Sequence, residues 1–214
     1  MTLTYRAARF TAWLAFKLFG HTEVIGHRNL PGEGGVIVAS NHVSYLDPPL
    51  VGSNIMRECA FMARHDLWHQ PILGWLISRL NAFPVHRDSA DRKALRTAVE
   101  VLRQGKVLVL FPEGTRSLDG RLQRAQPGLA LIVQLSTAPV VPCAVVGPEV
   151  MWPPGRRFPR PAKLKIVFGS PVFFSDDATR EEIVDTTMGC IAGLLQIYRP
   201  DLPVGDQYKP LFLA

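Results

Sequence analysis

The stretch that decides the fold is GVIVASNHVSYLDPP, residues 35–49, in which a short apolar segment runs directly into a polar one. Residues 35–40 are rich in β-branched side chains and begin with glycine, which predicts a buried strand. The two prolines after Asp47 predict that a helix begins there, because proline is favoured in the first turn of a helix. A buried strand that is followed, after a short loop, by a helix is typical of an α/β sheet.

The same alternation continues along the chain. Further strands are expected at residues 59–63, 81–87, 106–112, 139–147 and 163–169. Helices are expected at residues 66–80, 89–105 and 127–136. A last helix should begin at the capping box of Thr179 and Glu182 and end before Pro200. We therefore predict an α/β fold with a largely parallel or mixed central sheet and helices on both faces.

The composition is that of a globular domain with anionic partners. Of the 214 residues 47% are hydrophobic and 20% are charged, which excludes a disordered chain. The formal net charge of +6 favours phosphates, nucleic acid or an anionic membrane surface as partners. Three cysteines lie far apart without the spacing of a metal site, so a reducing compartment is expected.

The first twenty residues predict an amphipathic helix that lies on a membrane surface. Apolar and basic side chains recur at helical spacing, namely Phe10, Trp13, Leu14 and Lys17. The alternative is a first helix that packs on the core. The apolar stretch at 10–16 is far shorter than the roughly 20 residues that a spanning helix needs. We divide the chain into an interfacial helix at 1–20, a main domain at 21–200 and a C-terminal tail at 201–214.

His42 and Asp47 are the residue types of a general base and its orienting carboxylate. On a continuous helix their side chains would point about 140° apart, so they can meet only if His42 lies in the loop before the helix. Asp47 would then cap the helix and also hold the imidazole, leaving Nε2 free to accept a proton. The alternative is a loop histidine beside an ordinary helix cap.

Two more polar clusters follow predicted strands, HRDS at 86–89 and PEGTRS at 112–117. Because the carboxyl ends of parallel strands meet at one edge of a sheet, we expect both clusters to lie near His42. Arg87 in the first cluster suits an anionic group. Its alternative role is a solvated charge at the entry to the next helix.

The second cluster resembles an anion site more closely. Gly114 permits a close backbone approach, Thr115 offers a hydroxyl donor, and Arg116 offers a planar fork that matches phosphate. The alternative is an ordinary polar turn in which Glu113 and Arg116 form a surface pair. A histidine base beside arginines is suited to deprotonating an uncharged hydroxyl close to an anionic group.

The ordered set NHVSYLD, FPVHRD, FPEGTRS and VPCAVVG resembles the four motif blocks of the glycerolipid acyltransferase family. The match is best with its 1-acyl-glycerol-3-phosphate (lysophosphatidate) acyltransferase branch, and it covers about residues 20–170. The family transfers a fatty acyl group from a coenzyme A or acyl-carrier-protein thioester to a lysophospholipid hydroxyl. Its members are membrane-bound and need no metal for the transfer.

The resemblance implies a role for each matching residue. His42 would be the base and Asp47 its orienter. The acceptor and its phosphate would be bound by a set of residues from the second and third blocks: Arg87, Glu113, Gly114, Thr115 and Arg116. The fourth block, around Val141 and Pro142, would line the acyl region. Arg64, followed by Asp66, stands where the family often has lysine and glutamate, and would also contact phosphate.

We therefore expect an O-acyltransferase that acts on lysophosphatidate at the cytoplasmic face of the inner or plasma membrane. It would use acyl-CoA or acyl-carrier protein as donor substrate, with no cofactor, no metal and no nucleic acid. The alternatives are another lysolipid or glycolipid acceptor and, less expected, a non-enzymatic module that binds membrane surfaces through basic segments such as 156–165. A serine hydrolase is disfavoured, since no G-x-S-x-G occurs.

Overall fold

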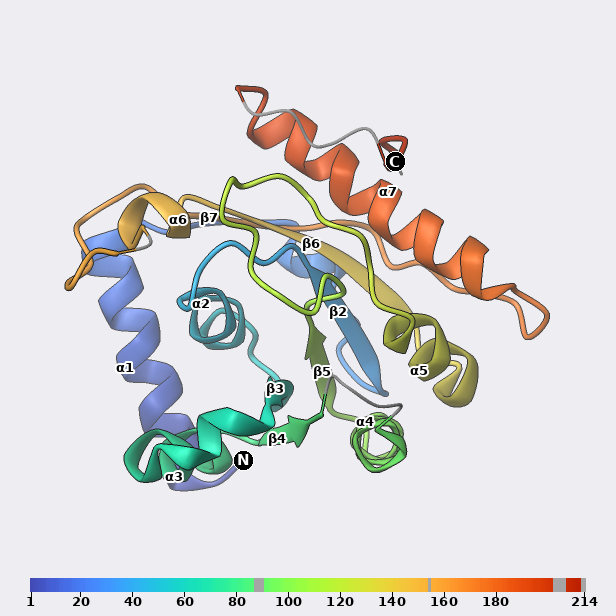
Figure 1. The fold of residues 1–214 in the computed structure, drawn as a ribbon, viewed down its shortest axis with the longest axis horizontal. Coiled ribbons are helices and arrows are strands. Elements are labelled where there is room, and N and C mark those ends of the chain that lie inside the picture. The colour runs from blue at the N-terminus through green and yellow to red at the C-terminus, as the bar shows by residue number, and fades with distance from the viewer. Residues whose placement is uncertain (87–90, 154, 202–206, 213–214) are drawn as a thin grey trace.

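The computed structural model describes residues 1–86, 91–153, 155–201 and 207–212. Within them a single sheet has the strand order β1-β7-β6-β2-β5-β3-β4 (Figure 1). Neighbouring strands are parallel except β6 and β7, which are antiparallel. The predicted mixed α/β sheet is confirmed. The strands are β1 (Glu23–Ile25), β2 (Val36–Ser40), β3 (Cys59–Arg64), β4 (Ala82–Val85), β5 (Val107–Leu110), β6 (Val140–Val146) and β7 (Lys165–Phe168).

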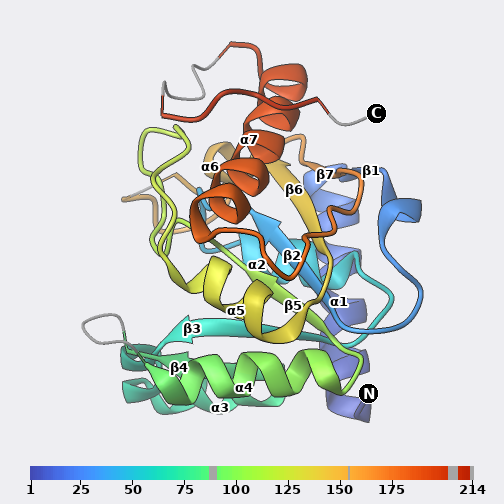
Figure 2. The same cartoon turned by 90° about the vertical axis from the view of Figure 1, so that its right-hand side faces the viewer.

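Helices cover both faces of the sheet, as predicted (Figure 2). They are α1 (Leu3–Gly20), α2 (Asp47–Ser53), α3 (Pro71–Arg79), α4 (Arg92–Arg103), α5 (Gly128–Ser136), α6 (Pro148–Met151) and α7 (Arg180–Tyr198), with the 3-10 helices η1 (His27–Asn29) and η2 (His65–His69). One buried cluster joins β2, β5 and β6 to α4, α5 and α7. The other joins the opposite sides of the same strands to α1 and α2. Alternate side chains of the central strands are buried on both faces, which explains their continuous apolar sequences.

Two loops leave the centre of the sheet together. In the parallel pair of β2 and β5, Ala39 lies opposite Leu110, so both strands end at the same edge. The chain after β2 therefore runs beside the chain after β5, as Figure 1 shows in front of the sheet. This is the edge at which ligands bind in open α/β sheets.

The prediction of one helix over residues 66–80 is wrong. The segment divides into η2 and α3, which are separated by Gln70 in an extended conformation (φ −94°, ψ 105°). Gln70 precedes Pro71, and the proline ring disfavours the helical conformation of the residue before it. Strand β1 was not predicted, because three residues give no periodic pattern.

Helix α1 packs partly on the core, which is the alternative stated for it. Tyr5 and Phe16 are buried, and the Tyr5 hydroxyl accepts a hydrogen bond from the Cys59 amide at 2.9 Å. Large apolar side chains remain exposed elsewhere on the helix, among them Leu3, Phe10, Leu18 and Phe19. No helix in the described part of the chain has the length and apolarity needed to cross a bilayer. The membrane role of α1 and the limits at 1–20, 21–200 and 201–214 stay predictions.

The described part of the tail packs against the domain. The Leu211 amide donates to the Gly189 carbonyl at 2.8 Å, and a Cβ on Gly193 would lie only 2.3 Å from the Leu211 carbonyl oxygen. Near the other end of the segment, the Tyr208 hydroxyl accepts a hydrogen bond from the Ala125 amide at 2.8 Å. The tail thus contacts both α7 and the long loop after β5.

Candidate active site

Asn41 anchors the loop that leaves β2. Its side chain accepts a hydrogen bond from the Val145 amide at 2.8 Å and donates to the Val145 carbonyl at 3.1 Å. The amide group thereby continues the pairing of β2 with β6 one residue beyond Ser40. Because Asn41 is buried, this pair of hydrogen bonds fixes where the following residue, His42, enters the loop.

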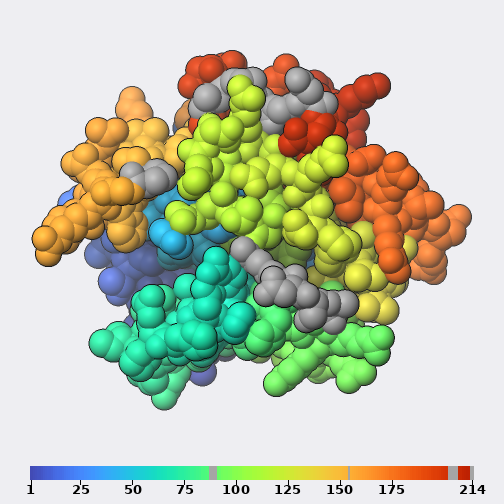
Figure 3. Space-filling view, in the orientation of Figure 1, coloured from blue at the N-terminus to red at the C-terminus, as the bar shows by residue number. Residues whose placement is uncertain are grey.

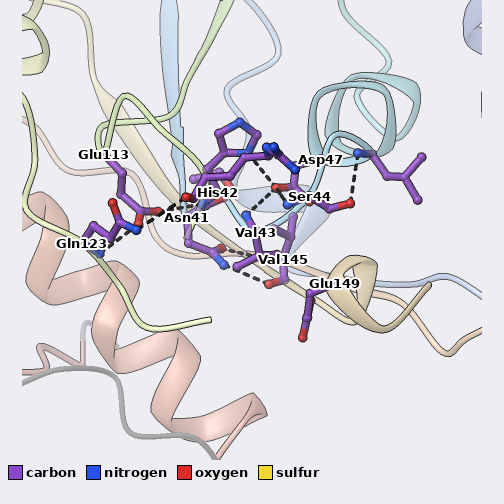
Figure 4. A network of polar contacts seen from close by, with 12 residues as sticks. Asn41, His42, Val43, Ser44, Asp47, Glu113, Gln123, Val145 and Glu149 are labelled. Carbon is purple, nitrogen blue, oxygen red and sulfur yellow. Dashed lines mark hydrogen bonds and ion pairs between the residues drawn. The ribbon is translucent and has the colours of Figure 1, made fainter. Parts of the chain in front are cut away.

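His42 and Asp47 meet in this loop (Figure 4). The His42 Nδ1 lies 2.8 Å from the Asp47 Oδ2. The same oxygen accepts hydrogen bonds from the amides of Val43, at 2.7 Å, and Ser44, at 2.8 Å. Since Oδ2 acts as an acceptor, Nδ1 is the donor and carries the hydrogen, which leaves the lone pair on Nε2.

Asp47 does not cap its helix, contrary to the expectation from sequence. It is the first residue of α2, the N-cap is Leu46, and no side chain caps the helix. The carboxylate instead turns back onto the preceding loop. Asp47 is completely buried, so the three donors at Oδ2 take the place of water there, and among the described residues Oδ1 has no hydrogen-bond partner. Its described contacts serve the loop of His42 rather than the helix end.

A second contact holds the imidazole from its face. The rings of His42 and Phe111 are stacked with their centroids 4.3 Å apart. Asp47 fixes one edge of the imidazole, Phe111 fixes one face, and 15% of the His42 side chain remains exposed. In Figure 3 the light-blue residues after β2 reach the surface between the yellow-green loop after β5 and the teal residues after β3. The imidazole is therefore both oriented and reachable.

Glu113 connects the loop after β5, on which it lies, to the loop after β2. One carboxylate oxygen accepts a hydrogen bond from the His42 amide at 2.7 Å, and the other accepts from the Gln123 amide at 2.8 Å. A second connection between the two loops runs from the Ser117 amide to the His42 carbonyl at 2.7 Å. Only 2% of Glu113 is exposed, so the pairing of Glu113 with Arg116 at the surface does not occur. The carboxylate contacts main chain on both sides.

The environment of Glu113 changes its acidity. Burial raises the pKa of Glu113 to about 7, because the charged form loses its hydration. The two backbone N–H donors oppose this shift, while the nearby carboxylates of Asp47 and Asp119 add to it. Glu113 thus changes charge close to neutral pH.

Gly114 is required by the turn that follows Glu113. Its φ is +70°, a conformation that side chains with a Cβ rarely adopt. A Cβ at this position would also lie 2.8 Å from the Gln126 side chain. The glycine therefore allows the chain to reverse directly after the buried carboxylate.

The next two residues reach the rim of the site. Thr115 is exposed. The Arg116 guanidinium carbon lies 3.4 Å from the centre of the Tyr45 ring. Among the described residues no carboxylate or carbonyl accepts a hydrogen bond from the Arg116 side chain. The N–H groups of this guanidinium are available to an anion.

The remaining candidates are placed less directly. Arg64 lies at the end of β3 at the same edge of the sheet, where its guanidinium binds both carboxylate oxygens of Asp66. Arg87 lies outside the described residues. Val141 is fully buried in the cluster under α1 and α2, and Pro142 lines a cavity beside α7. The two residues named from the fourth block are therefore both buried in the core.

Sequence reasoning missed four residues that shape the site: Asn41, Tyr45, Phe111 and Gln123. The first three lie inside the quoted blocks, so their position pointed to the site, but nothing in the sequence indicated their contacts. Gln123 gave no signal, because it takes part through its main-chain amide.

A family model described as Acyltransferase matches residues 21–146, more than half of the chain. The chain belongs to this family. The match contains His42, Asp47 and the whole loop from Phe111 to Ser117. It confirms the predicted acyltransferase family, and together with the relatives it confirms the prediction of an O-acyltransferase.

Individual acyltransferases agree with this membership. A 1-acyl-sn-glycerol-3-phosphate acyltransferase of Bacillus subtilis is 31% identical over 163 residues, which are 75% of this chain and 78% of the relative. A chloroplastic enzyme of the same name from Brassica napus is 27% identical over 188 residues, and the match spans only 54% of its length. The crystal structure of the 1-acyl-sn-glycerophosphate (LPA) acyltransferase PlsC from Thermotoga maritima matches with a TM-score of 0.77 at 28% identity. That match covers 91% of this chain and 80% of the other.

Proposed function

We propose that this acyltransferase moves a fatty acyl group from an acyl-CoA or acyl-carrier-protein thioester to the free hydroxyl of 1-acyl-glycerol-3-phosphate, giving phosphatidic acid. The observation that carries the proposal is the oriented imidazole of His42 on the same rim as the Arg116 guanidinium, whose contact within the described residues is the Tyr45 ring. A hydroxyl substrate with a phosphate provides a partner for both groups. The names of the relatives support the same acceptor.

The proposed reaction depends on the hydrogen at His42 Nδ1, which leaves Nε2 able to accept a proton. Nε2 accepts the proton of the acceptor hydroxyl as the oxygen attacks the thioester carbonyl. The tetrahedral intermediate then collapses with cleavage of the C–S bond, and the thiolate takes the proton back from Nε2. Asp47 stabilises the imidazolium between these two steps. A thioester is already activated, so the reaction needs no covalent enzyme intermediate.

Arg116 would place the acceptor. A guanidinium binds a phosphate monoester through two parallel N–H donors, which fixes both position and direction. Holding the phosphate also holds the hydroxyl near Nε2, and such positioning lowers the barrier by replacing an encounter with a bound geometry. Arg64 is less suited to this task, because Asp66 already occupies the donor edge of its guanidinium.

The enzyme would act as a monotopic protein on the cytoplasmic face of a membrane. Helix α1 contains no acidic residue and exposes apolar side chains. The loop after α6 is basic and exposes Phe158, and its Ala162 amide donates to the Phe19 carbonyl at the end of α1. Apolar side chains between basic ones suit an interface of anionic lipid.

The membrane surface can be tested without removing α1, whose Tyr5 and Phe16 belong to the fold. Substituting Phe10→Ser and Leu18→Ser together should weaken co-sedimentation with vesicles that contain anionic lipid. Phe173→Ser is the control, since Phe173 is 73% exposed elsewhere. Equal sedimentation of the double variant and the control would contradict a membrane role for α1.

The acceptor can be tested by substituting Arg116. Arg116→Ala should raise the KM for lysophosphatidate about 10- to 100-fold, because the substitution removes the free energy that hydrogen bonds to a charged group contribute to binding. The KM for acyl-CoA should not change. Arg121→Ala is the matched control, because Arg121 is an exposed arginine on the same loop. The assay should include lysolipids without a phosphate monoester; wild-type preference for one of those would contradict the assigned acceptor.

A further inference from the structure

Tyr45 is an unusual occupant of the loop that carries His42. Its side chain is 64% exposed, although His42 and Asp47 on either side of it are held by hydrogen bonds. The ring is not unpartnered, because the Arg116 guanidinium carbon lies 3.4 Å from its centre. Two residues that are 71 positions apart in sequence, one from each loop, therefore form a stack at the rim.

The backbone beneath this stack is rigid. The His42 amide donates to the Glu113 carboxylate, and the Ser117 amide donates to the His42 carbonyl. These bonds tie the two loops together on either side of Arg116. The stacked side chains thus extend from fixed positions, and only their own rotamers remain to be set.

The contact with the Tyr45 ring does not cover the N–H donors of the Arg116 guanidinium. The ring covers one face of the group, whereas the N–H donors lie in its plane and point away from the contact. Arg64 shows the opposite arrangement, since a carboxylate binds its donor edge. An arginine that is held by its face is fixed in position and still able to bind an anion.

We propose that Tyr45 is a positioning residue for the acceptor: its ring fixes Arg116 at the rim, and thereby fixes the distance between the bound phosphate and the hydroxyl that His42 deprotonates. This inference rests on the proposed function and adds a determinant of acceptor specificity to it. The aromatic ring supplies the contact, so the Tyr45 hydroxyl is not required.

The kinetic test compares Tyr45→Leu with Tyr45→Phe, using a water-soluble short-chain lysophosphatidate so that membrane binding does not enter. Tyr45→Leu should raise the KM for this acceptor about 2- to 5-fold, corresponding to about 0.5–1 kcal/mol for a cation–π contact at an exposed site. Its KM for acyl-CoA should be unchanged, and Tyr45→Phe should match the wild type. Trp75→Leu is the control, because Trp75 stacks with Arg79 on α3, apart from the two loops (Figures 1 and 2).

A second measurement reports on Arg116 without turnover. The Arg116 side-chain N–H resonance, assigned by its absence in Arg116→Lys, should be shifted upfield by the ring current in the wild type and in Tyr45→Phe. The shift should vanish in Tyr45→Leu.

The outcomes separate the two proposals. Wild-type protein without transfer to any lysolipid would defeat the proposed function, while the resonance would still decide whether Tyr45 holds Arg116. A missing shift in the wild type, or an equal rise of both KM values in Tyr45→Leu, would overturn the positioning role. A loss in Tyr45→Phe as large as in Tyr45→Leu would overturn the role of the ring.

Discussion

Each of the two loops at the carboxyl edge of the sheet is held by a buried carboxylate, and the two carboxylates make different contacts. At the loop after β2, Asp47 from the start of α2 accepts hydrogen bonds from three donors on one oxygen, and one of them is the His42 ring. In the loop after β5, Glu113 takes one backbone amide on each oxygen. Both side chains are almost fully buried. Burial alone therefore does not distinguish the carboxylate that orients the His42 ring from the one that joins two loops.

The difference lies in what each carboxylate contacts. Asp47 acts on a side chain whose proton moves in the proposed reaction. Glu113 acts on main chain, and so affects where His42 and Arg116 lie without touching the proton. Loss of Asp47 should change the chemistry, and loss of Glu113 should change the geometry.

The largest effect is expected for Asp47→Asn. The amide oxygen can replace Oδ2 as the acceptor for the Val43, Ser44 and His42 donors, but a neutral amide no longer stabilises the imidazolium that forms when Nε2 takes the hydroxyl proton. The kcat for acyl transfer should fall about 100- to 10,000-fold, the usual contribution of a general base. Steady-state assays with release of free thiol measure it.

Asp119→Asn is the control for this substitution. Asp119 is 66% exposed on the loop after β5 and contacts Ser117 and Arg121. Its substitution should change kcat by less than about 2-fold, as expected for exposed polar contacts. An Asp47→Asn enzyme with the activity of the control would remove the distinction between the two buried carboxylates.

A pH-dependent stability should distinguish Glu113 next. Its pKa is about 7 in the folded protein, whereas the ordinary pKa of a glutamate, which it regains on unfolding, is 4.5. Between these two pKa values the folded state binds a proton that the unfolded state does not. The contribution of Glu113 to the free energy of unfolding therefore increases as the pH falls from 7 toward 4.5, and is lost as the pH rises to 7. The unfolding free energy of the wild type, relative to Glu113→Gln, should be up to about 3 kcal/mol higher at low pH than above pH 7.

Urea unfolding of both proteins on either side of pH 7 measures this difference, because all other titrating groups are shared. A difference that does not depend on pH, or one that increases with pH, would contradict an ionisable Glu113 in the interior.

A smaller effect is expected on transfer by Glu113→Gln. Glutamine can accept from only one of the two amides, since its NH2 group faces the other. The loss of one such hydrogen bond, about 1–1.5 kcal/mol, should lower kcat/KM about 10-fold through displaced loops. The His42–Asp47 pair is retained. A loss equal to that of Asp47→Asn would show that Glu113 takes part in proton transfer itself.

Much of the fold could be predicted from local pattern. The central strands are continuous apolar segments, because both faces are buried. Helix α7 begins directly after its N-cap Thr179, whose hydroxyl accepts a hydrogen bond from the Glu182 amide as the capping box predicts. Pro71 indicates the break between η2 and α3 at Gln70, but the apolar pattern on both sides of it favours one continuous helix. Strand β1 exists because it pairs with β7, which lies about 140 residues away in sequence.

The site could be predicted only in part. His42 and Asp47 lie five residues apart, so local geometry suffices to bring them together. The contacts of Glu113 with the amides of His42 and Gln123 depend on the alignment of β2 and β5 and on a long loop. Main-chain donors have no sequence signature, and a stack such as Tyr45 on Arg116 depends on two loops being tied together. Such contacts require the assembled fold.

The central claim is that His42, held by Asp47, takes the proton from the acceptor hydroxyl. The most direct measurement is the rate of acyl transfer from acyl-CoA to lysophosphatidate by His42→Ala beside the wild type, with the melting temperature of both recorded. The proposed mechanism predicts a loss of at least about 100-fold at an unchanged melting temperature. Transfer within a few-fold of the wild-type rate would contradict it.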